Sequence, residues 1–438
     1  MQTAARIHRL LGRMVAIEAH EVRATLLGFA WFCCLLSGYY LLRPLRDALG
    51  VVGGPQALRW LFTATFVVML LLVPVFGWLV AKFPARRFVP YIYRFFALTL
   101  LSFGALLALR QDSVWLARSF FVWVSVFNLF VVSLFWSVLD DCFSSAQGRR
   151  LFGFIAAGGT LGTLIGPLLA AAMVSLSGPL LLLVLAALLL ELALHCFRGI
   201  YPKPSARVEP GRTAQSRALG GQVWAGLALI VRPPYLLGIC TYLLLHTAAS
   251  TFLYFEQARI VADALPDTVS RTRFFAGVDL GVSCLALTLQ LLVSGRLMRR
   301  FGLVPCLALL PLVSVAALGA LALAPVLGVL ACVQVLRRAL DYAIARPARE
   351  VLFTVVRREE KYQAKNAIET LVYRGGDALS GWLFSTLAAL GLGAGGIALL
   401  AAPVAGAWTL LCAWLGRRQE RLAAGAGGAR DTTPSEEA

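Results

Sequence analysis

Residues 178–197 read GPLLLLVLAALLLELALHCF, a run in which leucine, alanine and valine dominate. A run of roughly 20 residues is long enough for an α-helix to cross a hydrocarbon core of about 30 Å. Comparable apolar runs recur along the whole 438-residue chain, and they do not alternate apolar with polar residues. Because backbone groups in lipid must be satisfied inside a helix or a closed barrel, we predict membrane-spanning helices.

The composition supports the same fold class. Hydrophobic residues make up 59% of the chain and charged residues only 14%, and the mean hydropathy is +0.79, whereas about half of a soluble domain is apolar. We predict an all-α integral membrane protein with twelve transmembrane helices, near residues 24–43, 58–81, 89–109, 114–138, 151–175, 178–197, 234–258, 274–295, 303–323, 325–343, 368–390 and 393–415.

The formal net charge of +18 raises the possibility of a nucleic-acid binder, but the position of the charges argues against it. Of the 40 Lys and Arg residues, 27 fall in segments on the side of the N-terminus and 8 in segments on the other side. The positive-inside rule then places both termini in the cytoplasm, which requires an even number of helices. The bias towards alanine, arginine and leucine is typical of a GC-rich bacterial genome, so we expect a multi-pass protein of a bacterial inner membrane.

The chain divides near its midpoint. We predict a cytoplasmic amphipathic N-terminus (1–22), a six-helix half (23–197), a cytoplasmic linker (198–233), a second six-helix half (234–416) and a disordered cytoplasmic tail (417–438). An internal repeat supports two halves, because the stretch from Gly77 to Phe83 matches the stretch from Gly295 to Phe301 at an offset of 218. Gly158-Gly159 and Gly375-Gly376 match at an offset of 217.

The repeated stretches resemble the loop motif of the major facilitator superfamily, in which a glycine ends one helix and clustered cations precede the next. We expect the glycine to let two helices approach and the cations to lie at the cytoplasmic face. The candidate structural or gating residues of this motif are Gly77, Arg86, Arg87, Gly295, Arg299 and Arg300. Gly158, Gly162 and Gly166 recur every fourth residue, which predicts a smooth helix face for close packing. Plain positive-inside charge is the alternative explanation for the cations.

Charged residues inside the predicted helices are candidates for function, because each costs at least a few kcal/mol to insert. In 37–47 (SGYYLLRPLRD) Arg43 and Arg46 lie three residues apart, and Pro44 is expected to kink or end the helix. Two guanidinium groups beside two tyrosines suit a phosphate or carboxylate, although arginines and aromatic anchors at the membrane surface explain the pattern equally well. The candidate solute-binding residues are Tyr39, Tyr40, Arg43, Arg46, Asp47, Glu256, Arg259, Arg374 and Asp377. Asp341 is spaced to pair with either Arg337 or Arg338 on one helix face. Arg150, Arg338 and Asp341 are further candidate gating or structural residues.

The sequence offers little to a catalytic or metal-dependent function. It contains no GxxxxGK[ST], HExxH or GxSxG motif. Nine cysteines lie in the apolar segments without a CxxC pair, and the four histidines show no ligand spacing, so we expect neither disulfides nor a metal. We expect no enzyme activity and no cofactor.

The chain also resembles the ATP/ADP translocases of intracellular bacteria and plastids and their relatives in free-living bacteria. The family pattern Tyr-x-x-Leu-Arg-x-x-Lys-Asp-x-Leu corresponds to residues 39–49 (YYLLRPLRDAL), and Phe135-Trp136 followed by Arg150, Gly153 and Gly158-Gly159 matches a second region. The chain departs from the pattern at Arg46, where the family has lysine, at Pro44 and in 374–377 (RGGD). The resemblance implies a major facilitator fold and an organic anion as solute, with ATP/ADP exchange as one option.

The leading hypothesis is a secondary transporter in which two halves rock around a binding site for an organic, nucleotide-like anion, with a proton as a potential second ligand. The expected partners are this anion and the lipid bilayer, with no nucleic acid, and the protein is expected to be a monomer. Two alternatives stay open: an exporter of an unrelated small molecule or drug with the same fold, and a non-transporting membrane scaffold or membrane-embedded enzyme. The excess of arginine argues against a cationic solute.

Overall fold

The computed structural model describes residues 17–18, 20–110, 113–200, 234–356 and 368–428. Within these ranges all regular secondary structure is helical, as the uninterrupted apolar runs predicted. The first group of helices comprises α2 (Val22–Gly50), α3 (Pro55–Lys82), α4 (Ala85–Leu109), α5 (Val114–Cys142) and α6 (Ser145–Ile200). The second comprises α8 (Pro234–Ala264), α9 (Thr268–Leu289), α10 (Gly295–Phe301), α11 (Leu303–Leu323), α12 (Leu327–Leu340), α13 (Arg346–Leu352), α15 (Tyr373–Ala389) and α16 (Ala394–Gly428).

Three short segments have π-helical hydrogen bonding: η3 (Gln290–Ser294), η4 (Asp341–Ala345) and η6 (Ile368–Val372). A 3₁₀ turn, η5 (Phe353–Val355), follows α13. π-Helical turns are rare and often occur at functional sites. They explain why the tenth and eleventh predicted membrane segments are interrupted helices rather than single long α-helices.

All twelve segments predicted from the sequence lie on helical stretches, and the fold class is confirmed. In the described ranges ten spans are long and apolar enough to cross a membrane. Two of these spans, Arg150–Leu176 and Gly178–Ile200, belong to α6. Gly178 separates them with a φ of +65°, a backbone conformation that glycine adopts without steric cost.

The chain forms two compact units. The first contains residues 1–53, 71–217 and 265–283, and the second contains 54–70, 218–264 and 284–438. The units differ from the contiguous halves expected from the sequence, because residues 54–70 belong to the second unit and residues 265–283 to the first. The division into two halves at the linker therefore stays a prediction.

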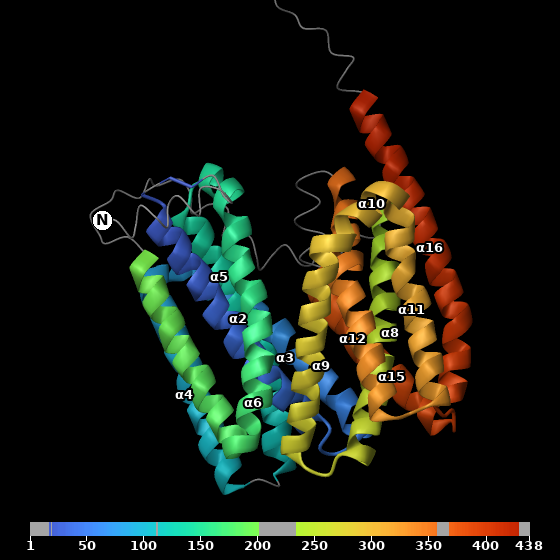
Figure 1. The fold of residues 1–438 in the computed structure, drawn as a ribbon, viewed down its shortest axis with the longest axis horizontal. Coiled ribbons are helices and arrows are strands. Elements are labelled where there is room, and N and C mark those ends of the chain that lie inside the picture. Colours follow the sequence, from blue (N-terminus) through green and yellow to red (C-terminus); the bar gives the residue numbers. More distant parts are fainter. Residues whose placement is uncertain (1–16, 19, 111–112, 201–233, 357–367, 429–438) are drawn as a thin grey trace, which may run out of the picture. The chain divides into compact units, whose positions relative to one another are not determined.

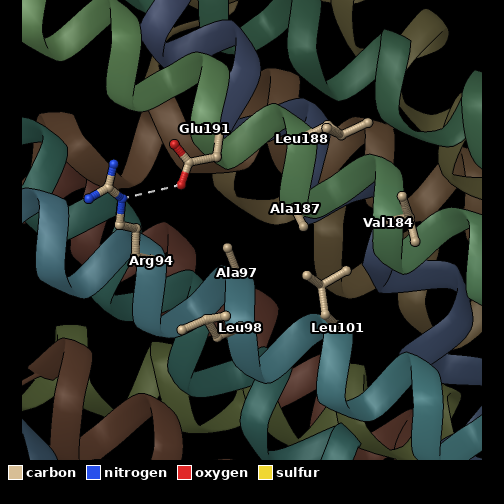
Figure 2. Close-up of a pocket in the computed structure, with 8 residues that line it drawn as sticks. All are labelled: Arg94, Ala97, Leu98, Leu101, Val184, Ala187, Leu188 and Glu191. Carbon is tan, nitrogen blue, oxygen red and sulfur yellow. Dashed lines mark ion pairs between the residues drawn. The ribbon is translucent and has the colours of Figure 1, made fainter.

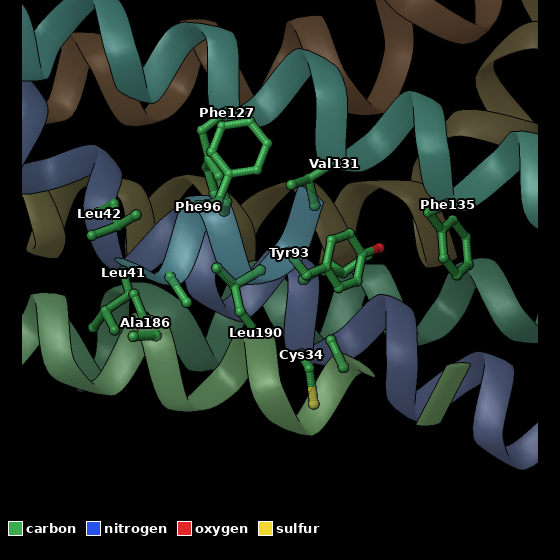
Figure 3. Packing of buried hydrophobic residues seen from close by; sticks show 14 of the residues in the cluster. Cys34, Leu41, Leu42, Tyr93, Phe96, Phe127, Val131, Phe135, Ala186 and Leu190 are labelled. Atoms are coloured by element: carbon green, nitrogen blue, oxygen red, sulfur yellow. The ribbon is translucent and has the colours of Figure 1, made fainter. Parts of the chain in front are cut away.

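The core of the first unit joins α2, α4, α5 and α6 (Figure 1). Figure 3 shows Leu41, Phe96, Phe127 and Leu190 from these four helices packed together. A buried hydrogen bond of 3.0 Å from Trp31 Nε1 to the Tyr93 hydroxyl links α2 to α4 inside this core. It satisfies two polar groups that would be costly to bury unpaired.

In the second unit α8, α11, α15 and α16 pack side by side (Figure 1). Their core contains buried leucines together with Tyr242 and Trp408, whose ring centroids lie 5.7 Å apart. Large apolar side chains point outward in both units, and Leu109 and Leu323 are 81% and 89% exposed. Such surfaces suit a lipid solvent, and the protein is a multi-pass membrane protein.

The glycine face of α6 packs directly on the backbone of α2. A Cβ atom added at Gly162 would lie 2.7 Å from the carbonyl oxygen of Cys33, and one at Gly166 would lie 2.7 Å from that of Ser37. At Gly158 a Cβ would overlap the carbonyl oxygen of Phe29. Only a hydrogen atom fits at these positions, so the four-residue glycine spacing sets how closely the two helices approach.

Four expectations need correction or limitation. Helix α16 continues to Gly428, so residues 417–428 are helical rather than disordered, because Arg, Gln, Glu, Leu and Ala in 417–424 are good helix formers. Pro44 does not end α2, which continues to Gly50 although the proline cannot donate one backbone hydrogen bond. At Gly295 an added Cβ would meet open space among the described residues, so close helix approach does not explain this glycine. The predicted amphipathic segment (1–22) and linker (198–233) lie mostly outside the described residues.

Candidate functional site

The last turns of α2 place two arginines in a cluster with two aspartates of the same unit. The side chains of Arg43 and Arg46 are 15% and 14% exposed. Asp47 Oδ1 accepts hydrogen bonds from Nε and Nη2 of Arg46, at 2.9 and 2.6 Å. Arg43 Nε lies 4.0 Å from the other Asp47 oxygen and 3.8 Å from Asp279 Oδ2 on α9. We call Arg43, Arg46, Asp47 and Asp279 the α2 charge cluster.

Aromatic rings border this cluster. The guanidinium carbon of Arg43 lies 5.6 Å from the ring centroid of Tyr40, and that of Arg46 lies 5.1 Å from the ring of Phe121 on α5. Tyr39 and Tyr40 meet edge to face, with centroids 5.3 Å apart. A guanidinium group that lies over an aromatic face can also pair with a planar anion in its own plane.

The structure adds Asp279 to the predicted residues, and this addition changes the charge balance. Asp279 is 2% exposed and stands opposite Arg43 from a helix that is distant in sequence. Two guanidinium groups and two carboxylates leave the α2 charge cluster formally neutral. A buried charge in a predicted helix was the available signal for Asp279, but its spacing gave no indication of its partner.

The remaining predicted solute-binding residues lie in the second unit and form two separate pairs. Arg259 Nη2 lies 2.7 Å from Glu256 Oε2 on α8, and Glu256 is only 3% exposed. Arg374 Nη1 lies 3.7 Å from Asp377 Oδ2 on α15, and Asp377 also accepts a hydrogen bond of 3.3 Å from Thr251. Both pairs follow the expected three-residue spacing along one helix face.

Asp341 has two partners that its spacing in the sequence did not suggest. Its Oδ2 lies 3.3 Å from Nε of Arg346, five residues further on. Its Oδ1 lies 4.0 Å from Nε2 of His246 on α8. His246 is 2% exposed and was not identified from the sequence, because an isolated histidine in an apolar helix carries no spacing signal.

The predicted gating residues occupy helix ends. Arg86 and Arg87 are exposed in the first turn of α4, and Arg299 and Arg300 are exposed in the last turn of α10. Gly77 lies in α3 and Arg338 in α12. The expected location of these cations at the cytoplasmic face stays a prediction.

Arg150 joins the start of α6 to the residues that precede α2. Its Nη2 donates to Glu21 Oε1 at 2.9 Å and lies 3.6 Å from Glu18, while Gln147 Nε2 donates to the same Glu21 oxygen at 2.9 Å. Burial raises the pKa of Glu21, but hydrogen bonds from the Glu18 amide, Gln147 and Arg150 outweigh it and hold that pKa below its ordinary value. His20 completes a group of potential metal ligands with Glu18 and Glu21, and Arg150 already supplies the positive charge there.

An apolar groove lies between α4 and α6 (Figure 2). Its walls are aliphatic side chains such as Leu98, Leu101 and Leu188, and the exposed fractions of these three leucines are 64%, 43% and 61%, respectively. One ion pair, Arg94 Nε to Glu191 Oε1 at 3.6 Å, closes an end. The exposure of these leucines fits a lipid-facing surface rather than a site for a polar solute.

Comparisons with known proteins place this architecture in a family. Solved structures with a similar fold include an auto-inhibited peptide transporter of the POT family (16% identity, TM-score 0.61, covering 90% of this chain and 97% of that chain), the nucleoside transporter NupG (12%, 0.55, 90% and 98%) and a bacterial homologue of the iron transporter ferroportin in an inward-facing state (13%, 0.58, 92% and 99%). A search of curated proteins finds no match. The sequence model of the Major Facilitator Superfamily matches residues 24–345, and the chain therefore belongs to this superfamily of membrane transporters.

Proposed function

We propose that this chain is a secondary transporter of an organic anion, which it moves across a bacterial inner membrane by alternating access with both termini in the cytoplasm. The superfamily carries the transporter part of this proposal. The α2 charge cluster carries the anion part, since two mostly buried arginines lie there with aromatic rings beside them.

The neutral charge balance of the cluster suggests how the anion would bind. A buried arginine needs a partner of opposite charge, and in this conformation Asp47 and Asp279 supply it. A carboxylate or phosphate group of the solute can replace these aspartates as the partner of the arginines. Arginine suits this exchange, because its planar fork donates hydrogen bonds to two oxygen atoms of one anion at a time.

The nature of the anion rests on the likeness of residues 39–49 to the translocase pattern. That likeness favours a nucleotide as the first solute to test, and exchange of one nucleotide for another as the first transport mode. The fold neighbours include transporters of peptides, nucleosides and iron, so the fold alone selects no solute.

Counterflow into proteoliposomes tests the proposal. Vesicles loaded with an unlabelled nucleotide or another organic anion are diluted into the labelled compound, and accumulation is measured. We expect accumulation with at least one organic anion, its loss in Arg46→Ala, and its partial return in Arg46→Lys, which keeps the charge but not the fork. Arg94→Ala is the matched control, since it removes an arginine that faces the apolar groove of the same unit.

Two results would count against the proposal. Transport of a cation or a neutral drug with every organic anion inactive would favour the exporter alternative. Equal loss in Arg46→Ala and Arg94→Ala would mean that the α2 charge cluster has no special role. If nucleotides fail while another organic anion is exchanged, the anion proposal stands and the translocase branch is wrong.

A further inference from the structure

A second buried polar cluster lies wholly inside the second unit, where α8, α12, η4, α13 and α15 meet. His246, Arg337 and Asp341 are 2%, 5% and 6% exposed, which is unusual for side chains of these types. None of the three belongs to the α2 charge cluster. We call His246, Asp341, Tyr373, Arg337 and Arg346 the His246 cluster.

One imidazole nitrogen faces two different partners in this cluster. His246 Nε2 lies 3.4 Å from the Tyr373 hydroxyl and 4.0 Å from Asp341 Oδ1. A neutral imidazole with a bare Nε2 accepts a hydrogen bond from Tyr373. Protonation places a hydrogen on Nε2, so Tyr373 can no longer donate to this nitrogen, and the anionic Asp341 carboxylate becomes the stronger acceptor for that hydrogen.

Charges of both signs surround His246. The Asp341 carboxylate lies 4.0 Å from it, and Arg337 and Arg346 supply positive charge from α12 and α13. The ionisable groups that face His246, Asp341 or Tyr373 from the surrounding helices are Tyr242 (α8), Arg337 (α12), Arg346 and Arg349 (α13) and Asp377 (α15). Cys412 (α16) faces Tyr242. Arg337 donates through Nη2 to Ser250 Oγ, and its buried Nε has no hydrogen-bond partner among the described residues.

We propose that His246 is a proton-binding site, with Asp341 as the partner of the protonated imidazole and Tyr373 as the donor to the neutral one. The proton comes from water and adds to Nε2, so that the imidazolium shares the Asp341 carboxylate with Arg346. The inference does not depend on which solute the transporter carries.

The π-helical turn η4 makes the site responsive to this proton. Asp341 and Arg346 are five residues apart, and residues at this spacing share a face of a π-helical turn but not of a regular α-helix. Competition from His246 for the carboxylate weakens the ion pair that accompanies the π turn. The carbonyl groups of Tyr342 and Ala343 accept hydrogen bonds from Gln290 (3.2 Å) and Ser294 (2.6 Å) of η3, so a second π turn contacts the first.

Trp408 gives the site a built-in reporter. Its ring centroid lies 6.2 Å from that of His246, and a protonated imidazole quenches a nearby indole by accepting an electron from its excited state. The experiment is a fluorescence titration of the purified protein in detergent across acidic and neutral pH. The chain has ten tryptophans, so the signal of Trp408 is the difference between the wild type and Trp408→Phe.

We expect one pH step in this difference signal and its loss in His246→Gln. Asp341→Asn removes the partner of the imidazolium and moves the step to more acidic pH. Tyr373→Phe removes the donor to the neutral imidazole and moves the step the opposite way. His195→Gln is the matched control: His195 is exposed on α6, its Nδ1 lies 2.9 Å from the Glu191 carbonyl oxygen, and the step must stay in place.

A step that survives in His246→Gln, or the absence of a Trp408-dependent step in the wild type, would overturn the proposal. If His246→Gln does not yield monodisperse protein, the opposite shifts in Asp341→Asn and Tyr373→Phe decide the matter. Shifts in the same direction, or none, then reject it. No transported solute is needed, so failure of the anion proposal leaves this result unaffected.

Discussion

The contact between α2 and α6 yields a prediction whose size follows from the coordinates. Gly162→Ala adds a Cβ atom 2.7 Å from the Cys33 carbonyl oxygen and 2.9 Å from the Ser37 amide nitrogen. Both neighbours are backbone atoms of α2, so no side chain can rotate away and one helix must shift. Overpacking of this kind typically costs about 1–3 kcal/mol.

A matched control lies on the same helix. Gly153→Ala places its Cβ in open space, so it gains only the helix propensity of alanine over glycine, about 0.5–1 kcal/mol. Both substitutions share this propensity gain, and their difference isolates the steric effect of about 1–3 kcal/mol. Gly158→Ala should be the most damaging, because its Cβ would overlap the Phe29 carbonyl group.

The assay is thermal unfolding of the purified variants in detergent, under identical conditions. The expected order of melting temperature is Gly153→Ala at or above the wild type, then Gly162→Ala, then Gly158→Ala. A melting temperature of Gly162→Ala equal to that of Gly153→Ala would refute the claim that the glycine face sets the distance between α2 and α6.

Two further predictions concern residues outside the solute and proton sites. The pKa of Glu21 is lowered in the folded protein, so the ionised carboxylate should stabilise the fold fully above the pKa of Glu21 in the unfolded chain, and this stabilisation should vanish as pH falls through its pKa in the folded protein. The melting temperatures of the wild type and Glu21→Gln should therefore differ at neutral pH and converge in acid. A difference that stays constant with pH would contradict this. Gly302 joins α10 to α11 with φ +79° and ψ −169°, a backbone conformation that is essentially restricted to glycine. Gly302→Ala should therefore lower the free energy of unfolding by about 1–3 kcal/mol, whereas Gly319→Ala, with open space around its Cβ, should not. Equal melting temperatures of the two variants would show that alanine at position 302 causes no backbone strain.

Much of the fold could be read from the sequence because lipid imposes a simple rule. Each apolar run such as 178–197 must satisfy its own backbone hydrogen bonds, and only a helix does so within one segment. The Gly158–Gly162–Gly166 spacing likewise predicted a packing face correctly, since residues four apart lie on one side of a helix. The tail at 417–428 was missed, because composition suggested disorder while the individual residues favour helix.

The candidate sites were predicted only in part. Arg43 and Asp47 lie four residues apart, so their pairing follows from helix geometry. Arg46 and Asp47 are adjacent in sequence, and helix geometry alone does not predict their contact. The pairing of Arg43 with Asp279 and of His246 with Asp341 crosses 236 and 95 positions, respectively, as the residue numbers give them. No local spacing reports such pairs.

The sequence by itself determined that this protein is a bundle of membrane helices, and it identified several of the charged residues in those helices. Hydropathy and helical periodicity are local properties, and each segment obeys them independently of its neighbours. The tertiary structure decided which of these charges meet, that two aspartates neutralise the arginines of α2, and that His246 lies between Tyr373 and Asp341. The physical reason is that the stability of a buried charge depends on the partners that packing brings within a few ångströms, and packing involves residues from distant parts of the chain.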